Sequence, residues 1–100
     1  MPIKTWRLVA GAGIAGDLAA AVGWYSNVGM GVERRFVAEV RAVMQRIAAN
    51  PSKYQVVHTN IQRALVARFP YAVYFCVQPD HVVVLAVLRA NRDPAVWQAR

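Results

Sequence analysis

The sequence has few acidic residues and only one cysteine. Its five aspartate and glutamate residues stand against twelve lysine and arginine residues, which gives a net charge of +7 at neutral pH. The lone Cys76 excludes an internal disulfide, and its place in an apolar stretch predicts a buried thiol in a reducing cytoplasm. The apolar opening before Asp17 is rich in glycine, and no run of transmembrane length follows it. We therefore expect a soluble, unprocessed cytoplasmic chain with no membrane role.

The chain is short, apolar and rich in arginine. One hundred residues, 57% of them hydrophobic, predict a single domain, residues 1–100, around one core. Two of the twelve basic residues are the lysines Lys4 and Lys53, so the other ten are arginines. A guanidinium group binds carboxylates and phosphates through two parallel hydrogen bonds and stacks on aromatic rings. The expected partners are therefore anionic, either nucleic acid or an acidic protein.

The spacing of apolar residues predicts two helices followed by several strands. Helical spacing marks residues 15–27 and 32–49, with glycines between them and Asn50-Pro51 as the stop. Alternation predicts strands at residues 3–10, 54–58, 61–69, 71–77 and 81–89, and a turn of helix can follow Pro94. The predicted fold is α+β: an N-terminal strand and an antiparallel helical hairpin packed on a mainly antiparallel sheet of four to five strands. The last strands are apolar on both faces, so either the C-terminal tail or a partner must cover the second face.

The segment Gly11–Gly16 matches the dinucleotide-binding pattern G-x-G-x-x-G between a predicted strand and a helix. That pattern also requires a parallel strand soon after the helix, ending in an acidic residue that binds the ribose. Here a second helix follows instead. We therefore interpret the glycines as a flexible lead into the helix and expect no nucleotide cofactor.

Metal binding and acyl transfer find little support. His58, His81 and Cys76 lack the spacing of a ligand set, and neither serine lies near a recognisable base and acid. We expect no metal and no other cofactor.

Four arginines on or near the predicted strands are the candidate functional groups. Arg63 and Arg68 point to opposite faces of one strand, and Arg89 and Arg92 follow the next strand but one. Across an antiparallel sheet the last two could approach Arg68, near the two tyrosines Tyr71 and Tyr74. Such a cluster could bind a phosphodiester or stack on bases. The alternative is that these arginines are solvated charges, or that Arg92 pairs with its neighbour or with the C-terminus.

Segments spread over the chain from about residue 17 resemble the RelE/ParE family of toxins from bacterial type II toxin–antitoxin systems, which includes plasmid stabilisation proteins. The resemblance rests on residues 24–25, Gly31, Phe36, 46–47, 50–51, Arg63, 68–71, 73–75, 84–88, 92–94 and Trp97. It implies a helical hairpin on an antiparallel sheet, the fold that the periodicities predict. It also implies a growth-inhibiting toxin that is held inactive in a hetero-oligomer with a cognate acidic antitoxin.

The resemblance implies two possible activities, and a third possibility is an inactive relic. RelE-like members cleave messenger RNA on the ribosome, for which Arg68 and Arg92 would be the catalytic residues. ParE-like members block DNA gyrase without cleavage. Many relatives have histidine at the position of Arg89, and an arginine is a poor base, so we favour the ParE-like, non-enzymatic activity. The residues expected to contact the antitoxin or the target are Arg63, Arg68, Tyr71, Tyr74, Arg89, Arg92 and Trp97.

Overall fold

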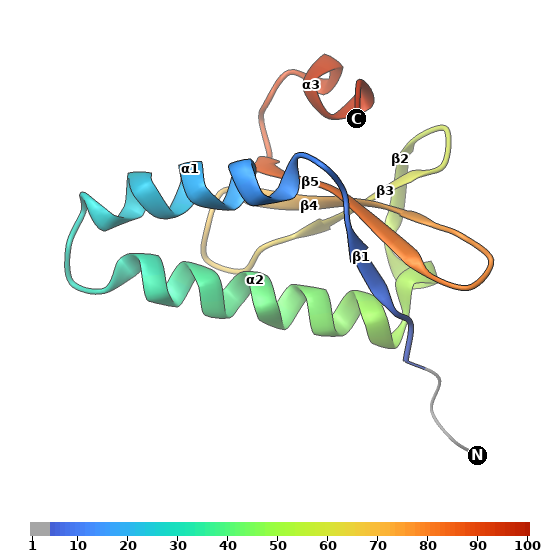
Figure 1. Cartoon of the computed structure of the whole chain (residues 1–100), viewed down its shortest axis with the longest axis horizontal. Coiled ribbons are helices and arrows are strands. Elements are labelled where there is room, and N and C mark those ends of the chain that lie inside the picture. Colours follow the sequence, from blue (N-terminus) through green and yellow to red (C-terminus); the bar gives the residue numbers. More distant parts are fainter. Residues whose placement is uncertain (1–4) are drawn as a thin grey trace.

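Two helices lie against one face of a five-stranded sheet in a computed structural model that describes residues 5–100 (Figure 1). The α+β prediction is therefore confirmed. In chain order the elements are β1 (Leu8–Ala10), α1 (Ile14–Ser26), α2 (Val32–Ala49), a 3-10 turn (Pro51–Lys53), β2 (Gln55–His58), β3 (Ile61–Leu65), β4 (Tyr71–Val77), β5 (Val82–Arg89) and α3 (Pro94–Gln98).

The strand order is β1-β5-β4-β3-β2, so the N-terminal strand lies at one edge beside the last strand. β1 runs parallel to β5, and the other neighbours are antiparallel. β1 is short and pairs with β5 only from Val82 to Val84. From Leu85 to Arg89, therefore, the outer edge of β5 has no strand beside it among the described residues.

The two helices differ in how they meet the sheet. α2 buries Phe36, Val40, Val43 and Ile47, which fall three and four residues apart and form one apolar face. α1 buries only three side chains, and its alanines allow close packing on α2 and β5. The turn between the helices contains three consecutive residues with positive φ, and the middle one, Met30, is 94% exposed.

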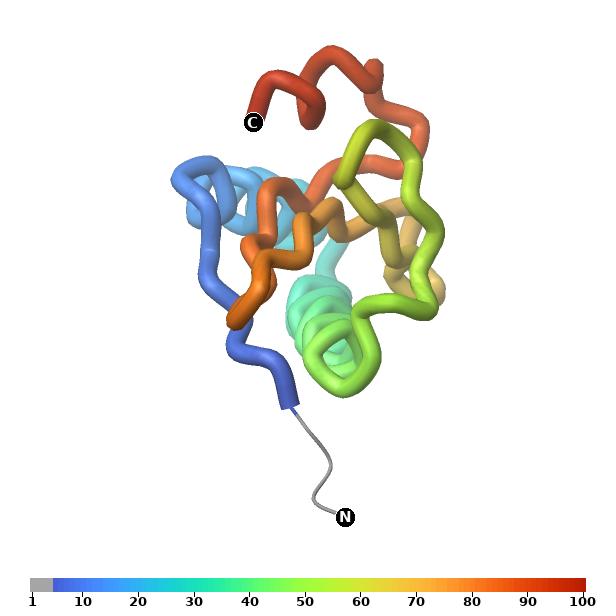
Figure 2. Tube along the Cα trace, turned by 90° about the vertical axis from the view of Figure 1, so that its right-hand side faces the viewer, coloured from blue at the N-terminus to red at the C-terminus, as the bar shows by residue number. Residues whose placement is uncertain are grey.

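The sheet has a core on each face. The larger core lies between the sheet and the two helices. The smaller one gathers Ala72, Tyr74, Ala86 and Leu88 under Trp97 of α3. Figure 2 shows the sheet between α2 and this C-terminal segment. The sequence left open whether the C-terminal tail or a partner covers the second face of the sheet. The structure shows that the tail covers it.

Several predicted boundaries shift. The first strand was expected at residues 3–10, but it starts at Leu8, and residues 3 and 4 lie outside the described part of the chain. The strand expected at residues 61–69 ends at Leu65, because the chain turns back there. Val66 donates to the carbonyl of Tyr71 at 2.9 Å, and Arg68 inside the turn has a φ of 68°. An apolar sequence continues through this turn, and periodicity alone could not locate it.

The sequence suggested that the glycine motif is a flexible lead into the helix. In the structure, two of its glycines pack closely against other parts of the chain. Gly11 lies so close to β5 that a Cβ atom there would be 2.8 Å from the carbonyl oxygen of Val84. A Cβ atom at Gly13 would overlap the guanidinium of Arg100. Gly11 is thus required by close packing against the backbone of β5, whereas a larger residue at Gly13 would have to displace the flexible end of the Arg100 side chain.

Candidate functional site

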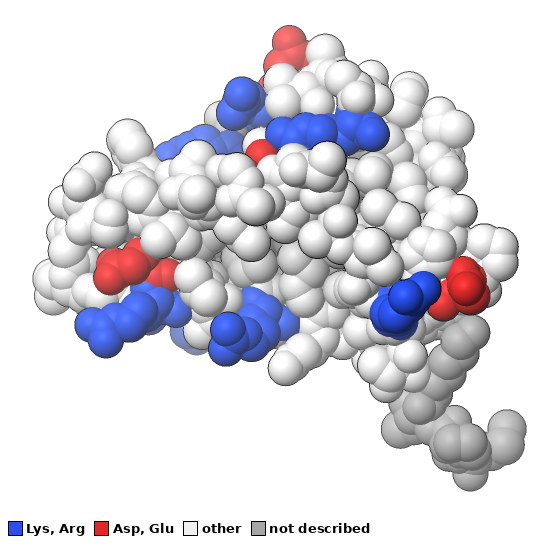
Figure 3. Space-filling model, in the orientation of Figure 1, with Lys and Arg blue, Asp and Glu red and all other residues white. Residues whose placement is uncertain are grey.

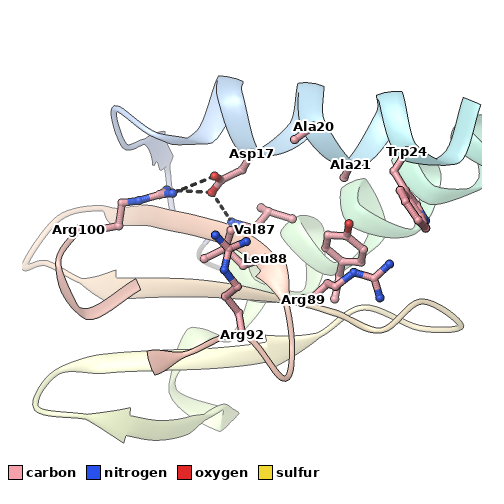
Figure 4. Close-up of a pocket in the computed structure, with 10 residues that line it drawn as sticks. Asp17, Ala20, Ala21, Trp24, Val87, Leu88, Arg89, Arg92 and Arg100 are labelled. Carbon is pink, nitrogen blue, oxygen red and sulfur yellow. Dashed lines mark hydrogen bonds and ion pairs between the residues drawn. The ribbon is translucent and has the colours of Figure 1, made fainter. Parts of the chain in front are cut away.

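A groove of 450 Å³ runs between α1 and the outer edge of β5. We call it the α1–β5 groove (Figure 4). Its lining combines small and aromatic residues of α1 with strand residues and three arginines: Asp17, Ala20, Ala21, Trp24, Tyr71, Val87, Leu88, Arg89, Arg92 and Arg100. Basic side chains also gather between α1 and α3 in the surface view, where little acidic surface is visible (Figure 3). The groove is therefore basic, with a single acidic side chain in its lining.

That acidic side chain is already paired. The carboxylate of Asp17 accepts two hydrogen bonds from Arg100, both at 2.9 Å, and one from the backbone N–H of Val87 at 3.0 Å. Arg100 also donates to the carbonyl of Leu85 at 3.2 Å. The bond to Asp17 raises the pKa of the Arg100 guanidinium above its ordinary value, although partial burial opposes the change. This pair therefore covers the β5 edge beside Leu85 and Val87, where none of residues 5–100 forms a neighbouring strand.

The other two arginines of the groove have no acidic partner within residues 5–100. The half-buried Arg89 lies over two aromatic rings, with its guanidinium carbon 5.7 Å from the centre of Trp24 and 5.6 Å from that of Tyr71. These are cation–π distances. Arg92 is exposed, and its N–H donates to the carbonyl of Arg89, so the two residues share one turn. The charge of both guanidinium groups is free for an anionic ligand.

Tyr71, which the sequence predicts to contact the antitoxin or the target, is largely buried. It is 8% exposed and packs against the aromatic rings of Tyr25 on α1 and Phe36 on α2, while Arg89 lies over its own ring. Phe69 joins the same cluster. Burial raises the pKa of Tyr25, the centre of the cluster. These rings attach the α1–α2 hairpin to β4 beside the groove.

Tyr74 and Trp97 are also buried, although both were predicted to contact a partner. Tyr74 is 1% exposed and stacks on Trp97 with ring centres 4.6 Å apart and planes 14° from parallel. Arg63 pairs with Tyr74 across the strands and is half-buried on the same face of the sheet. The two aromatic residues therefore attach α3 to the sheet, because α3 is too short to be stable alone.

The predicted arginine cluster does not form. Arg68 opens on a different hollow, next to α2, lined by Val32, Arg35, Ala38, Glu39, Arg68 and Phe69. Arg89 and Arg92 open on the α1–β5 groove instead. The reason is the turn after β3, which carries Arg68 away from the strand position that periodicity had assigned to it. Of the predicted site residues, the groove brings together Tyr71, Arg89 and Arg92 only.

Sequence reasoning missed three groove residues: Asp17, Trp24 as a partner of Arg89, and Arg100. Asp17 lies in the first turn of α1, where its charge also suits the positive end of the helix dipole. One signal could have identified it, since it lies on the same side of α1 as the buried Ala21, where an acid requires a partner. No local signal marks Arg100, because its contact with Asp17 joins residues 83 positions apart.

The comparison with protein families decides the kind of protein. A model described as the ParE toxin of the type II toxin–antitoxin system parDE matches residues 14–94. The chain belongs to the ParE toxin family. This match covers the chain from the start of α1 to the start of α3, including every groove residue except Arg100. The RelE/ParE resemblance is therefore confirmed.

A solved structure supports the fold of this ParE family member. This protein is similar to a solved chain described as "Chromosomal ParDE TA system from P. aeruginosa", with a TM-score of 0.73 and 16% sequence identity. The similarity covers 86% of this chain and 97% of that one. At such low identity the likeness shows the fold alone. No curated protein sequence matches the chain.

The family assignment makes the protein a ParE-like toxin of a type II system, with an antitoxin as its partner. Between residues 5 and 100, no helix is both long and apolar enough to cross a bilayer. The same residues contain no group of three or more His, Cys, Asp or Glu side chains that could hold a metal ion.

Proposed function

We propose that this toxin stops growth by binding DNA gyrase, without cleaving RNA, and that an acidic antitoxin holds it inactive. The observation that carries the proposal is the separation of Arg68 and Arg92 into two hollows. A ribonuclease of this family would need both groups at one phosphodiester, with a base or acid beside them. Neither hollow is lined by a histidine.

The burial of the tyrosines supports the same proposal. A phenol that exchanges protons with a substrate must reach it within hydrogen-bond distance. Tyr74 is covered by Trp97, and Tyr71, although it lines the groove, is only 8% exposed and packs against the rings of Tyr25 and Phe36. Arg89, where many relatives have histidine, is held between two rings and cannot serve as a base near neutral pH. The exposed groups that remain suit contact with a partner rather than proton transfer.

The acidic antitoxin is proposed on charge. The chain has a net charge of +7, and within residues 5–100 only Asp17–Arg100 joins an arginine to an acid. An acidic partner would neutralise this excess and would associate rapidly at low salt.

The test is to induce the protein in cells without its antitoxin, and to measure plasmid supercoiling and protein synthesis separately. Loss of negative supercoiling before any fall in translation is the expected result. A translation block with normal supercoiling would favour the RelE-like ribonuclease and contradict the proposal. Normal growth at full expression would indicate an inactive relic.

A further inference from the structure

The outer face of α2, on the side away from the sheet, carries four arginines, while the acids of the helix lie nearer the core. The exposed arginines are Arg34, Arg35, Arg41 and Arg46. Glu33 and Glu39 each lie three residues from the buried Phe36, which turns them toward the core, and both are half-buried. Figures 1 and 2 show α2 at the outside of the molecule, and basic side chains gather along it in the surface view (Figure 3).

The four arginines form two rows on opposite flanks of this face. Arg34 and Arg41 are seven residues apart, close to two helical turns, and Arg41 lines a hollow against α1. Arg35 and Arg46 are eleven residues apart, close to three turns, and Arg35 lines the hollow beside Arg68. Since these two hollows lie on different sides of α2, the two rows do as well.

Small side chains separate the rows. The positions between them on the outer face are Ala38, Ala42, Gln45 and Ala49. An alanine adds only a methyl group to the backbone, so this part of the helix is a narrow ridge. The row from Arg35 to Arg46 extends about 16 Å along the helix axis. The outer face therefore presents two lines of positive charge with a ridge of small residues between them.

The guanidinium groups of the two rows have no partner within residues 5–100. The ion pairs in this part of the chain are Arg100–Asp17 and His81–Asp80. Glu39 lies four residues after Arg35, a spacing at which ion pairs form on helices, yet the two are not paired. Four unneutralised charges on one face attract a polyanion.

We propose that the outer face of α2 binds duplex DNA in the major groove. A helix with its side chains is about 10–12 Å across, and the major groove of B-DNA is about 12 Å wide. The ridge of small residues enters the groove, and each row of arginines contacts phosphates along one side of it. An RNA duplex is excluded, because its major groove is too narrow for side chains to read. The proposal goes beyond gyrase binding and does not depend on it.

The probe is a fluorescein-labelled DNA duplex of about 20 base pairs, or two helical turns, and its binding to the full chain is followed by anisotropy. We expect Arg35→Gln and Arg41→Gln, one from each row, to weaken binding about fivefold at about 0.1 M salt. Arg92→Gln removes the same charge from the turn before α3 and should change binding less than about twofold. Equal loss from all three variants would show non-specific charge attraction. That result, or no binding by the unmodified chain, would overturn the proposal.

A charge placed on the ridge tests where the duplex lies. Ala38→Glu adds a negative charge between the two rows, and we expect it to weaken binding about tenfold. Ala95→Glu adds the same charge to an exposed position on α3 and is the matched control, with an expected change of less than about twofold. Equal effects of the two substitutions would contradict the placement of DNA on α2.

An RNA duplex of the same sequence and length separates groove entry from attraction to phosphates alone. We expect it to bind at least about tenfold more weakly than the DNA duplex, because α2 cannot enter its major groove. Equal binding would overturn the groove geometry. Each variant is first checked for an unchanged unfolding midpoint, and supercoiling by gyrase is assayed separately. A failure of DNA binding is thereby distinguished from a failure of the proposed function.

Discussion

The pair between Asp17 and Arg100 should be a measurable source of stability, because it attaches the C-terminus to α1 and to the edge of β5. We expect Asp17→Asn to lower the free energy of unfolding by about 1.5 kcal/mol. The Asp17 side chain is 8% exposed and that of Arg100 is 27% exposed. The expected cost therefore lies between the small value of a surface pair and the 3–5 kcal/mol of a buried one. For a chain of this length the change corresponds to a fall in Tm of about 6–12 °C.

The assay is a double-mutant cycle measured by urea unfolding, with Asp17→Asn, Arg100→Gln and the double variant. Asparagine keeps an oxygen for the N–H of Val87, so the cycle reports chiefly on the ion pair. We expect a coupling energy of about 1 kcal/mol. The matched control pairs Asp17→Asn with Arg41→Gln, which is exposed on α2 and should show no coupling. Additivity within about 0.3 kcal/mol for the Asp17–Arg100 cycle would refute the reasoning.

Three further experiments test the packing. Gly11→Ala places a Cβ atom 2.8 Å from the carbonyl oxygen of Val84, so it should lower Tm clearly. Gly16→Ala, with open space around the new Cβ atom, should leave Tm equal or higher. The reverse order of the two Tm values would contradict the close approach of Gly11 to β5. Trp97→Ala should cost about 3–5 kcal/mol in urea unfolding because it empties the core under α3, and a cost under 1 kcal/mol would show that α3 is not docked. Burial raises the pKa of the Cys76 thiol, so alkylation by iodoacetamide at pH 8 should be at least about tenfold slower in the folded chain than in urea; equal rates would show an accessible thiolate.

Much of the fold could be predicted because its signals are local. The apolar face of α2 repeats every three to four residues, and Pro51, Pro70 and Pro79 mark the breaks before β2, β4 and β5. The end of β3 could not be predicted, because apolar residues continue from Leu65 through Val66 to Phe69 while the backbone turns. The turn depends on a positive φ at Arg68, a conformation that arginine does not favour.

The candidate site was predicted less well because its geometry depends on contacts distant in sequence. A tyrosine in an alternating strand suits a surface or a core equally, and it is the stacking of Trp97 that makes Tyr74 internal. Arg89 and Arg92 were found from their charge and position after the last strand. Their partner in the groove, α1, was not predicted, because nothing in the local sequence shows that β1 leaves β5 uncovered from Leu85 to Arg89.

The central claim is that this ParE family toxin acts on gyrase by contact, and a supercoiling assay with purified components tests it most directly. Relaxed plasmid, gyrase and ATP are incubated with the toxin, with the Arg68→Gln/Arg92→Gln double variant, or with no addition, and the topoisomers are separated on a gel. A parallel translation reaction monitors messenger RNA. The account predicts that the toxin blocks supercoiling and leaves the messenger intact. Normal supercoiling together with messenger cleavage that the double variant abolishes would contradict it.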